Sequence, residues 1–554
     1  MTLTGKNHAL TALFPAALFA LVSCGDGGSA DEGDADADVP AESAGDPDAG
    51  EGGLDGEADV EDDPDEEEDA ADDADEEENG GPVFEPDPAR IYDDIAYLAS
   101  VELAGREAAT AGNELALQYV EELFTGLGLE PAGDDGTYRH TFEFPMWALG
   151  APPSLSVNGE DLLPIDEFDV YRYSGSAAAD GRIVFVGYGV VVPPFDPDEY
   201  PSCPLDPGGY DDFAGMDVDG AVLLKYAGFP TGDYFGAENC PTESGLEAAV
   251  SHGALAILSV SDDWRPPEIL HGVNATRDGE QAPLPVLLLD RDVAEALFPD
   301  MADRHDDIND TLRPSSIETG LEASLSVEAT VTTAETSNIV GALPGADPEL
   351  GDEVVVVGGH VDHEWQDPGS GIIFPGADDN ASGTAIMMEL ARGAAWTIPS
   401  PARTIVFAAW NAEESGLHGS CAYVDRPSHP IESMIAMINL DSIGGGSGTG
   451  FWVLGGGLAV NRWLVEVMVG AQIEHRYEGV VRSATGSQSS DHFCFAGQGV
   501  PVMSLTTLGD HTHVHTQFDT IDVINLDELD VGSHLLWWTL EALANGTEGR
   551  YLDI

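Results

Sequence analysis

From residue 337 onward, short apolar runs alternate with loops and helical patterns. The run at 353–360 reads Glu-Val-Val-Val-Val-Gly-Gly-His and lacks the polar alternation of a half-exposed strand. Such a run is typical of a parallel strand that is buried on both faces. Similar runs occur at 403–410, 433–440 and 501–507, and helical patterns at 382–392 and 526–544. The alternation predicts an α/β fold with a mixed, mainly parallel sheet that is sandwiched by helices.

The middle of the chain has a different pattern. Residues 87–130 carry the apolar spacing of helices, with Gly126 and Gly128 as stop signals. Residues 140–330 are short β-rich runs separated by Pro, Gly and Asp, with one helical run at 245–252. At 554 residues the chain is too long for one ordinary domain. We therefore predict two folded units. A resemblance to a known family, given below, implies that residues 83–145 and 331–554 form one α/β domain, interrupted by a β-rich insert at 146–330.

The N-terminus has the pattern of an export signal. Lys6 precedes an apolar stretch at 9–22 that is too short to span a membrane. The following Leu-Val-Ser-Cys at 21–24 resembles a bacterial lipobox, with Cys24 as the lipid-carrying residue. We predict a lipoprotein signal peptide at 1–24 and an exported protein, lipid-anchored to a bacterial membrane in the cell envelope. The alternative is a plain secretory signal in which Cys24 is incidental.

Residues 25–82 are mostly Asp, Glu, Ala and Gly. Such a segment cannot bury enough apolar surface to offset its ordering entropy, so we predict a disordered linker. Calcium binding is an alternative, although no calcium-loop pattern is present. The formal net charge of -84 excludes nucleic acid as an expected partner, because phosphates would be repelled. A saline habitat and a GC-rich genome would both account for this acidity.

Four cysteines remain after Cys24, namely Cys203, Cys240, Cys421 and Cys494. An oxidising compartment permits two disulfides among them. Their spacing does not match a metal site, and it leaves the pairing open.

Metal-ligating residue types follow each of the four predicted strands. In chain order they are His360 and Asp362, Asp378 in the next loop, Glu413 and Glu414, Asp441, and the run His511, His513 and His515. Because ligands of open α/β sheets bind beyond the carboxyl ends of the strands, we expect these side chains to converge.

Imidazole and carboxylate groups are the ligands that zinc uses in proteins. One carboxylate can bridge two ions that lie ~3.5–4 Å apart, and the ions acidify a water between them. A further carboxylate, not itself a ligand, must accept the proton of that water. The adjacent Glu413 and Glu414 offer both roles, so the sequence predicts a site for two Zn²⁺ ions.

These motifs also occur in a known family. The order is His-x-Asp at 360–362, Gly-Ala-Asp-Asp-Asn at 376–380, Asn-Ala-Glu-Glu at 411–414, Asn-Leu-Asp at 439–441 and His-Thr-x-x-Asp-Thr at 515–520. It resembles the co-catalytic zinc exopeptidases of clan MH, which include bacterial leucine aminopeptidase, aminopeptidase Y and glutamate carboxypeptidase. The resemblance covers roughly residues 86–145 and 331–546. Residues 146–330 resemble the protease-associated insert of some members.

The resemblance implies five metal ligands: His360 and Asp441 on one ion, Glu414 and His515 on the other, and Asp378 as the bridge. It implies Glu413 as the general base. Asp362 would hydrogen-bond the far nitrogen of His360 and fix its tautomer. His515 is chosen from the triple-His run because Thr516, Asp519 and Thr520 follow at the family's offsets; His513 is the second choice.

The expected function is an exopeptidase acting on peptides, namely an aminopeptidase with a metal-bridging hydroxide as the nucleophile. A carboxypeptidase or dipeptidase is the alternative, and it would need a cation for the substrate's carboxylate, for which Arg476 and Arg482 are candidates. A non-catalytic binding relative and a one-zinc glutaminyl cyclase are further alternatives. Neither the preferred terminal residue nor an oligomeric state follows from the sequence.

Overall fold

The structure is a computed structural model of the whole chain. It describes residues 84–550, with gaps at 165–166, 172–173, 202, 231–239, 244, 261–280, 365–371, 399, 447–449, 456–458, 477–479, 484–489 and 510. The predicted signal peptide, Cys24 and the whole of the predicted linker at 25–82 lie outside the described residues.

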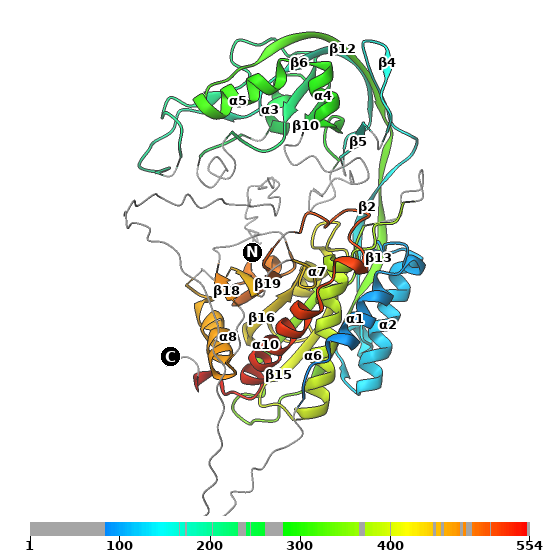
Figure 1. The fold of residues 1–554 in the computed structure, drawn as a ribbon, viewed down its shortest axis with the longest axis vertical. Coiled ribbons are helices and arrows are strands. Elements are labelled where there is room, and N and C mark those ends of the chain that lie inside the picture. Colours follow the sequence, from blue (N-terminus) through cyan, green and yellow to red (C-terminus); the bar gives the residue numbers. More distant parts are fainter. Residues whose placement is uncertain are drawn as a thin grey trace, which may run out of the picture. The chain divides into compact units, whose positions relative to one another are not determined.

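The larger of the two main sheets contains both parallel and antiparallel strands (Figure 1). Its strands run in the order β1 (Glu130–Pro131), β13 (Ala329–Leu343), β15 (Thr404–Trp410), β14 (Val354–His360), β16 (Met434–Leu440), β19 (Val502–Thr507), β17 (Gly450–Leu454) and β18 (Val480–Ser483), with β2 (Arg139–Leu149) paired to β13. The four central strands β15, β14, β16 and β19 are mutually parallel. Strands β13 and β17 join them antiparallel, so the prediction of a mixed sheet with a parallel centre is confirmed.

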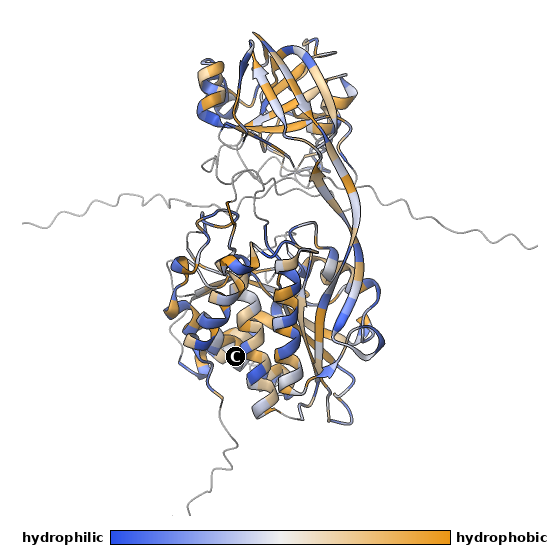
Figure 2. Ribbon diagram, turned by 90° about the vertical axis from the view of Figure 1, so that its right-hand side faces the viewer, coloured by the Kyte–Doolittle hydropathy of each residue, from blue (hydrophilic) through white to orange (hydrophobic). Residues whose placement is uncertain are grey.

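Successive side chains of a strand point to opposite faces, and β14 is buried on both. Val355 and Val357 belong to the core on one face, and Val354 and Val356 to the core on the other. The first face packs against α1 (Pro88–Leu98), α2 (Ala111–Leu127), α6 (Gly383–Thr397), α8 (Arg462–Glu474) and α10 (Leu526–Ala544). The second packs against α7 (His418–Asp425) and α9 (His492–Ala496). These helices carry both hydrophobic and hydrophilic residues, because each lies between the core and the solvent (Figure 2).

The two N-terminal helices begin and end at recognisable caps. Asp87 accepts hydrogen bonds from the first turn of α1, and Pro88 occupies its first position. Thr110 caps α2 in the same way, and Gly128 ends it in the left-handed conformation. The helical prediction for 87–130 is therefore confirmed as two helices.

A second, eight-stranded sheet lies within residues 154–327. Its order is β4 (Glu160–Asp161), β3 (Ser154–Val157), β12 (Ile317–Val327), β6 (Ala177–Phe185), β9 (Val222–Tyr226), β10 (Ala256–Val260), β11 (Val286–Leu289) and β5 (Phe168–Val170). It has hydrophobic clusters of its own and is accompanied by α3 (Gly245–Ser251), α4 (Arg291–Leu297) and α5 (Met301–Thr311). The β-rich character expected of 146–330 is present, while its exact boundaries stay a prediction.

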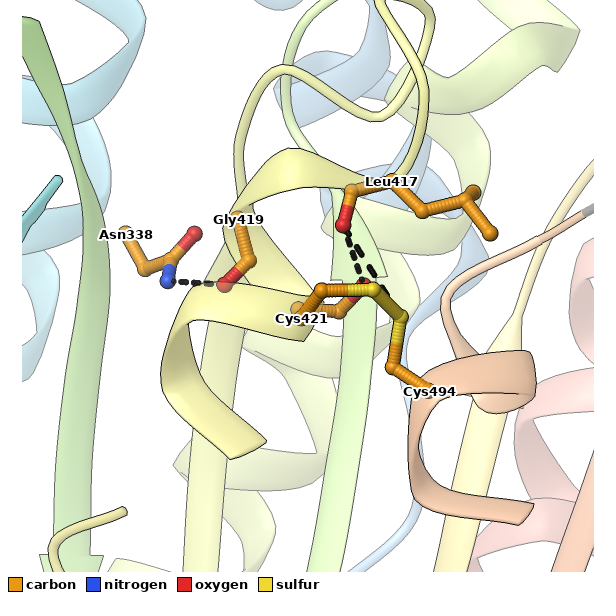
Figure 3. The surroundings of a disulfide bond; sticks show 6 residues. Asn338, Leu417, Gly419, Cys421 and Cys494 are labelled. Atoms are coloured by element: carbon orange, nitrogen blue, oxygen red, sulfur yellow. Dashed lines mark hydrogen bonds between the residues drawn. A yellow bond between two sulfur atoms is a disulfide. The ribbon is translucent and has the colours of Figure 1, made fainter. Parts of the chain in front are cut away.

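The structure pairs Cys203 with Cys240 and Cys421 with Cys494. Figure 3 shows the second disulfide, which joins α7 to α9. Beside it, the amide of Asn338 on β13 donates to the carbonyl of Gly419 at 2.8 Å. The start of α7 is thus fixed from two sides. Among the described helices, none has the length and apolarity needed to cross a bilayer.

Candidate metal centre

His360 is the last residue of β14 and is buried. Its Nε2 atom lies 3.2 Å from Oδ1 of Asp379 and 3.6 Å from Oδ1 of Asp441, the residue that follows β16. Its Nδ1 atom lies 3.2 Å from the backbone carbonyl of Asp362. Since a carbonyl only accepts, this contact places the hydrogen on Nδ1 and aims the lone pair of Nε2 at the two carboxylates.

A second group lies on the other side of Asp379. The Nε2 atom of His515 is 2.8 Å from Oδ2 of Asp379 and 3.2 Å from Oε2 of Glu414. The other oxygen of Glu414, Oε1, is 2.9 Å from Nδ1 of His363, which is buried. The ligand atoms of His363, Asp379, Glu414 and His515 lie within 4.8 Å of one another.

Asp379 therefore occupies the place predicted for Asp378. One of its oxygens faces His360 and the other faces His515. The side chain of Asp378 instead accepts from the backbone N–H groups of Gly444 and Gly445. The prediction that Asp378 lies between the two imidazoles is wrong, because neighbouring side chains leave the turn in different directions. His360, Glu414, Asp441 and His515 are brought together as expected.

Asp362 does not make its predicted contact through its side chain. Its carboxylate is 4.0 Å from Nδ1 of His360, whereas its backbone carbonyl is 3.2 Å away. The carboxylate accepts from the backbone N–H groups of Glu413 at 3.2 Å and Glu414 at 3.3 Å. Asp362 thus holds both the His360 ring and the Glu413–Glu414 turn.

Two buried residues that the sequence analysis did not assign also position the site. The carboxylate of Asp519 accepts from the N–H groups of Asp378 at 2.8 Å and Asp379 at 3.0 Å. The guanidinium of Arg106 donates to the carbonyls of Val361 at 2.8 Å and Gly376 at 2.6 Å, and to those of Leu98 and Pro375. Asp519 lies inside the motif at 515–520, so the sequence could have indicated its role. Arg106 lies in an irregular loop, and no sequence pattern marks it as part of the site.

The two adjacent glutamates have opposite electrostatic environments. Burial raises the pKa of Glu413 well above its ordinary value, and the nearby Glu414, Asp491 and Asp441 charges add to the rise. Burial also acts on Glu414, but the neighbouring His515 and His363 lower its pKa. Pairs of titratable groups whose pKa values are pushed apart are typical of acid–base sites.

The donor set fits two divalent transition-metal ions. Each half of the site offers one imidazole nitrogen and carboxylate oxygens, the combination that zinc prefers, and Asp379 presents one oxygen to each half. Most of these residues are buried, while the side chains of Asp441 and His515 are each 21% exposed, so a cation would meet pre-arranged ligands on a site with access from outside. His511 and His513 do not belong to this site and contact Asp378 instead.

Known proteins resemble this chain in sequence and in fold. Residues 338–538 match the model of Peptidase family M28. The fold matches an aminopeptidase from Aneurinibacillus sp. strain AM-1 with a TM-score of 0.60 and 21% identity, over 83% of this chain and 94% of that one. It also matches BSAP, a zinc aminopeptidase from Bacillus subtilis, with a TM-score of 0.59 and 21% identity, over 84% and 97% of the two chains.

A curated relative, the glutamate carboxypeptidase 2 homolog of Caenorhabditis elegans, is 35% identical over 131 residues, which are 23% of this chain and 16% of that protein. The chain spans less than half of the length of the first curated relatives that it matches.

Proposed function

Because its residues 338–538 match the model of Peptidase family M28, we propose that this chain is a zinc-dependent aminopeptidase that removes N-terminal residues from peptides. The observation that carries the proposal is the Asp379 carboxylate, whose two oxygens face His360 on one side and His515 on the other. A single carboxylate between two imidazoles is the arrangement expected of a two-ion hydrolytic site.

In this proposal His360 and Asp441 would hold one ion, Glu414 and His515 would hold the other, and Asp379 would offer one oxygen to each. His363 orients Glu414 through its 2.9 Å contact. When bound, two zinc ions supply Lewis acidity that polarises a carbonyl and acidifies water. The count of two ions is part of the proposal.

Glu413 is the proposed general base. It takes a proton from water as the water oxygen forms its bond to the scissile carbonyl carbon. As the C–N bond breaks, Glu413 delivers that proton to the leaving nitrogen, so that the amine leaves neutral. Burial raises the pKa of Glu413, which makes its carboxylate a stronger proton acceptor than an exposed glutamate.

The positions of the described arginines do not support the carboxypeptidase alternative, which needs a cation for the substrate's carboxylate. Of the two arginines considered for a carboxypeptidase, Arg476 is exposed and Arg482 lies 5.6 Å from the ring of Trp452. The buried Arg106 is engaged with backbone carbonyls.

The test compares peptides whose N-terminus is acetylated with peptides whose C-terminus is amidated, with and without a chelator. An aminopeptidase cleaves the amidated peptides and leaves the acetylated ones intact, and chelation stops the reaction. Cleavage of acetylated but not of amidated peptides would establish the carboxypeptidase alternative.

We further propose that the protein is exported and lipid-anchored through Cys24, and that 146–330 is a protease-associated domain. The support is the leader pattern at 1–24 and the two disulfides, since disulfides persist in oxidising compartments. A Cys24→Ala variant should lose incorporation of labelled fatty acid. Equal labelling of the variant and the parent chain would refute the anchor.

A further inference from the structure

A second cluster of ligand atoms lies around Asp378, separate from the atoms assigned to the catalytic pair. Its Oδ2 atom is 2.7 Å from Nδ1 of His511 and 3.0 Å from Nε2 of His513. Asp378 is fully buried, and the side chains of His511 and His513 are 10% and 15% exposed. We propose that Asp378, His511 and His513 bind a third divalent transition-metal ion, namely Zn²⁺.

The hydrogen bonds around the cluster aim these atoms at one another. The Nε2 atom of His511 lies 3.0 Å from the carbonyl oxygen of Thr507, which only accepts, so Nε2 carries the hydrogen. Nδ1 then faces the Asp378 carboxylate, so that either a second ring proton or a metal ion lies between Nδ1 and Oδ2. A bound metal ion would take the place of that proton on His511. A metal-bound histidine that donates its other N–H to a backbone carbonyl is the usual arrangement in metal sites.

The other oxygen of Asp378 is already satisfied. Oδ1 accepts from the N–H groups of Gly444 at 2.9 Å and Gly445 at 2.7 Å. This fixes the carboxylate and leaves Oδ2 as the oxygen directed at the two imidazoles. A single divalent ion would satisfy Oδ2 and both ring nitrogens together.

Gly445 lies directly against two of the ligand atoms. A Cβ atom at this position would lie 2.5 Å from Oδ2 of Asp378 and 3.1 Å from Nε2 of His513. The absence of a side chain therefore keeps the surroundings of both ligand atoms open.

The spacing of the atoms also suits zinc. In a tetrahedral zinc site with bonds of about 2.0–2.1 Å, neighbouring ligand atoms lie about 3.3 Å apart. The 2.7 and 3.0 Å separations at Asp378 need to widen by only a few tenths of an ångström. The contacts at Asp379 in the catalytic pair, 3.2 and 2.8 Å, are similar. Three protein ligands would leave a fourth position for water.

Such an ion would tie together the two segments that carry the catalytic ligands. Asp378 precedes Asp379, and His513 lies two residues before His515. The third ion would thus clamp the 511–515 loop onto the 377–382 turn. The third ion is inferred from Asp378, His511 and His513 alone. The two catalytic ions matter to the test only because they add to the total number of zinc ions per chain.

The test measures zinc per chain by elemental analysis after chelation, reloading with Zn²⁺ and desalting. The parent chain should hold three ions. The double variant His511→Gln/His513→Gln should hold two, and Gly445→Ala, which keeps all ligands but adds a methyl group in the ion's place, should also hold two. His534→Gln, which removes a histidine from α10, is the matched control and should keep three.

Equal zinc content in the parent chain and in both site variants would overturn the third ion, because the cluster would then be only a hydrogen-bonded Asp–His pair. Gly445→Ala keeps the test decisive if the double variant does not fold. A parent chain with one ion, lost only in the site variants, would instead refute the catalytic pair and leave the third site standing.

Discussion

The Oδ2 atom of Asp379 lies 2.8 Å from the Nε2 atom of His515, while the carboxylate of the preceding residue, Asp378, faces His511 and His513. Two adjacent aspartates thus serve two different groups of histidines. This division means that substitutions at 378 and 379 should have separable effects.

Asp379→Asn should lower kcat/KM by more than the ~10–100-fold typical of residues that only support a ligand, because the amide nitrogen cannot bind a cation. Zinc content should fall with it. The companion variant Asp378→Asn should leave both imidazoles on Asp379 in place and retain more activity. A larger loss for Asp378→Asn than for Asp379→Asn would contradict the bridging role of Asp379.

The Glu413→Gln variant tests whether Glu413 is the general base. The amide keeps the size of the side chain but cannot accept the proton, so kcat should fall by roughly 10²–10⁴-fold. Zinc content should stay at the parental value, since Glu413 is not assigned as a ligand. Elemental analysis beside steady-state kinetics measures both, and parental kcat in this variant would remove Glu413 from the mechanism.

Arg106→Met should destabilise the α/β domain. The guanidinium is fully buried, and its loss leaves the carbonyls of Val361 and Gly376 without these donors. Leaving a buried hydrogen-bond acceptor without its donor costs about 1–3 kcal/mol. Arg462 offers a matched control, because its side chain is 78% exposed and its ion pair with Glu466 is on the surface. Arg462→Met should leave the melting temperature unchanged, and equal melting temperatures for both variants would argue against the structural role of Arg106.

Asp212 gives the second sheet a predictable dependence on pH. Burial raises its pKa from 3.8 to about 7, although Val190, Tyr210 and Tyr188 donate hydrogen bonds that oppose the rise. The folded state therefore holds a proton that the unfolded chain releases between about pH 4 and 7, so this group's contribution to stability falls as pH rises through that window.

Asp212→Asn removes the titration. The melting temperature of the parent chain, relative to that of this variant, should fall between pH 4 and 7. Two parallel melting curves across this range would show that Asp212 does not titrate with a raised pKa.

Much of the fold could be predicted from the sequence, because burial on both faces leaves continuous apolar runs. The strand expected at 353–360 is β14, and the helix expected at 526–544 is α10. Ligand types at strand ends could also be predicted, since parallel strands end at one edge of the sheet.

Orientation within a turn could not be predicted. The Gly-Ala-Asp-Asp-Asn motif contains two adjacent aspartates, and only the hydrogen bonds from Gly444 and Gly445 decide which one turns away. The pairing of Cys421 with Cys494 likewise depends on α7 and α9 packing against the same face, a contact between segments distant in sequence.

The central claim is a two-ion site bridged by Asp379, and anomalous diffraction from zinc-loaded crystals tests it most directly. Two peaks ~3.5–4 Å apart should appear, one between His360 and Asp379 and the other between His515 and Asp379, in addition to any peak at the separate Asp378 cluster. A single peak beside Asp379, or no peak there, would contradict the claim.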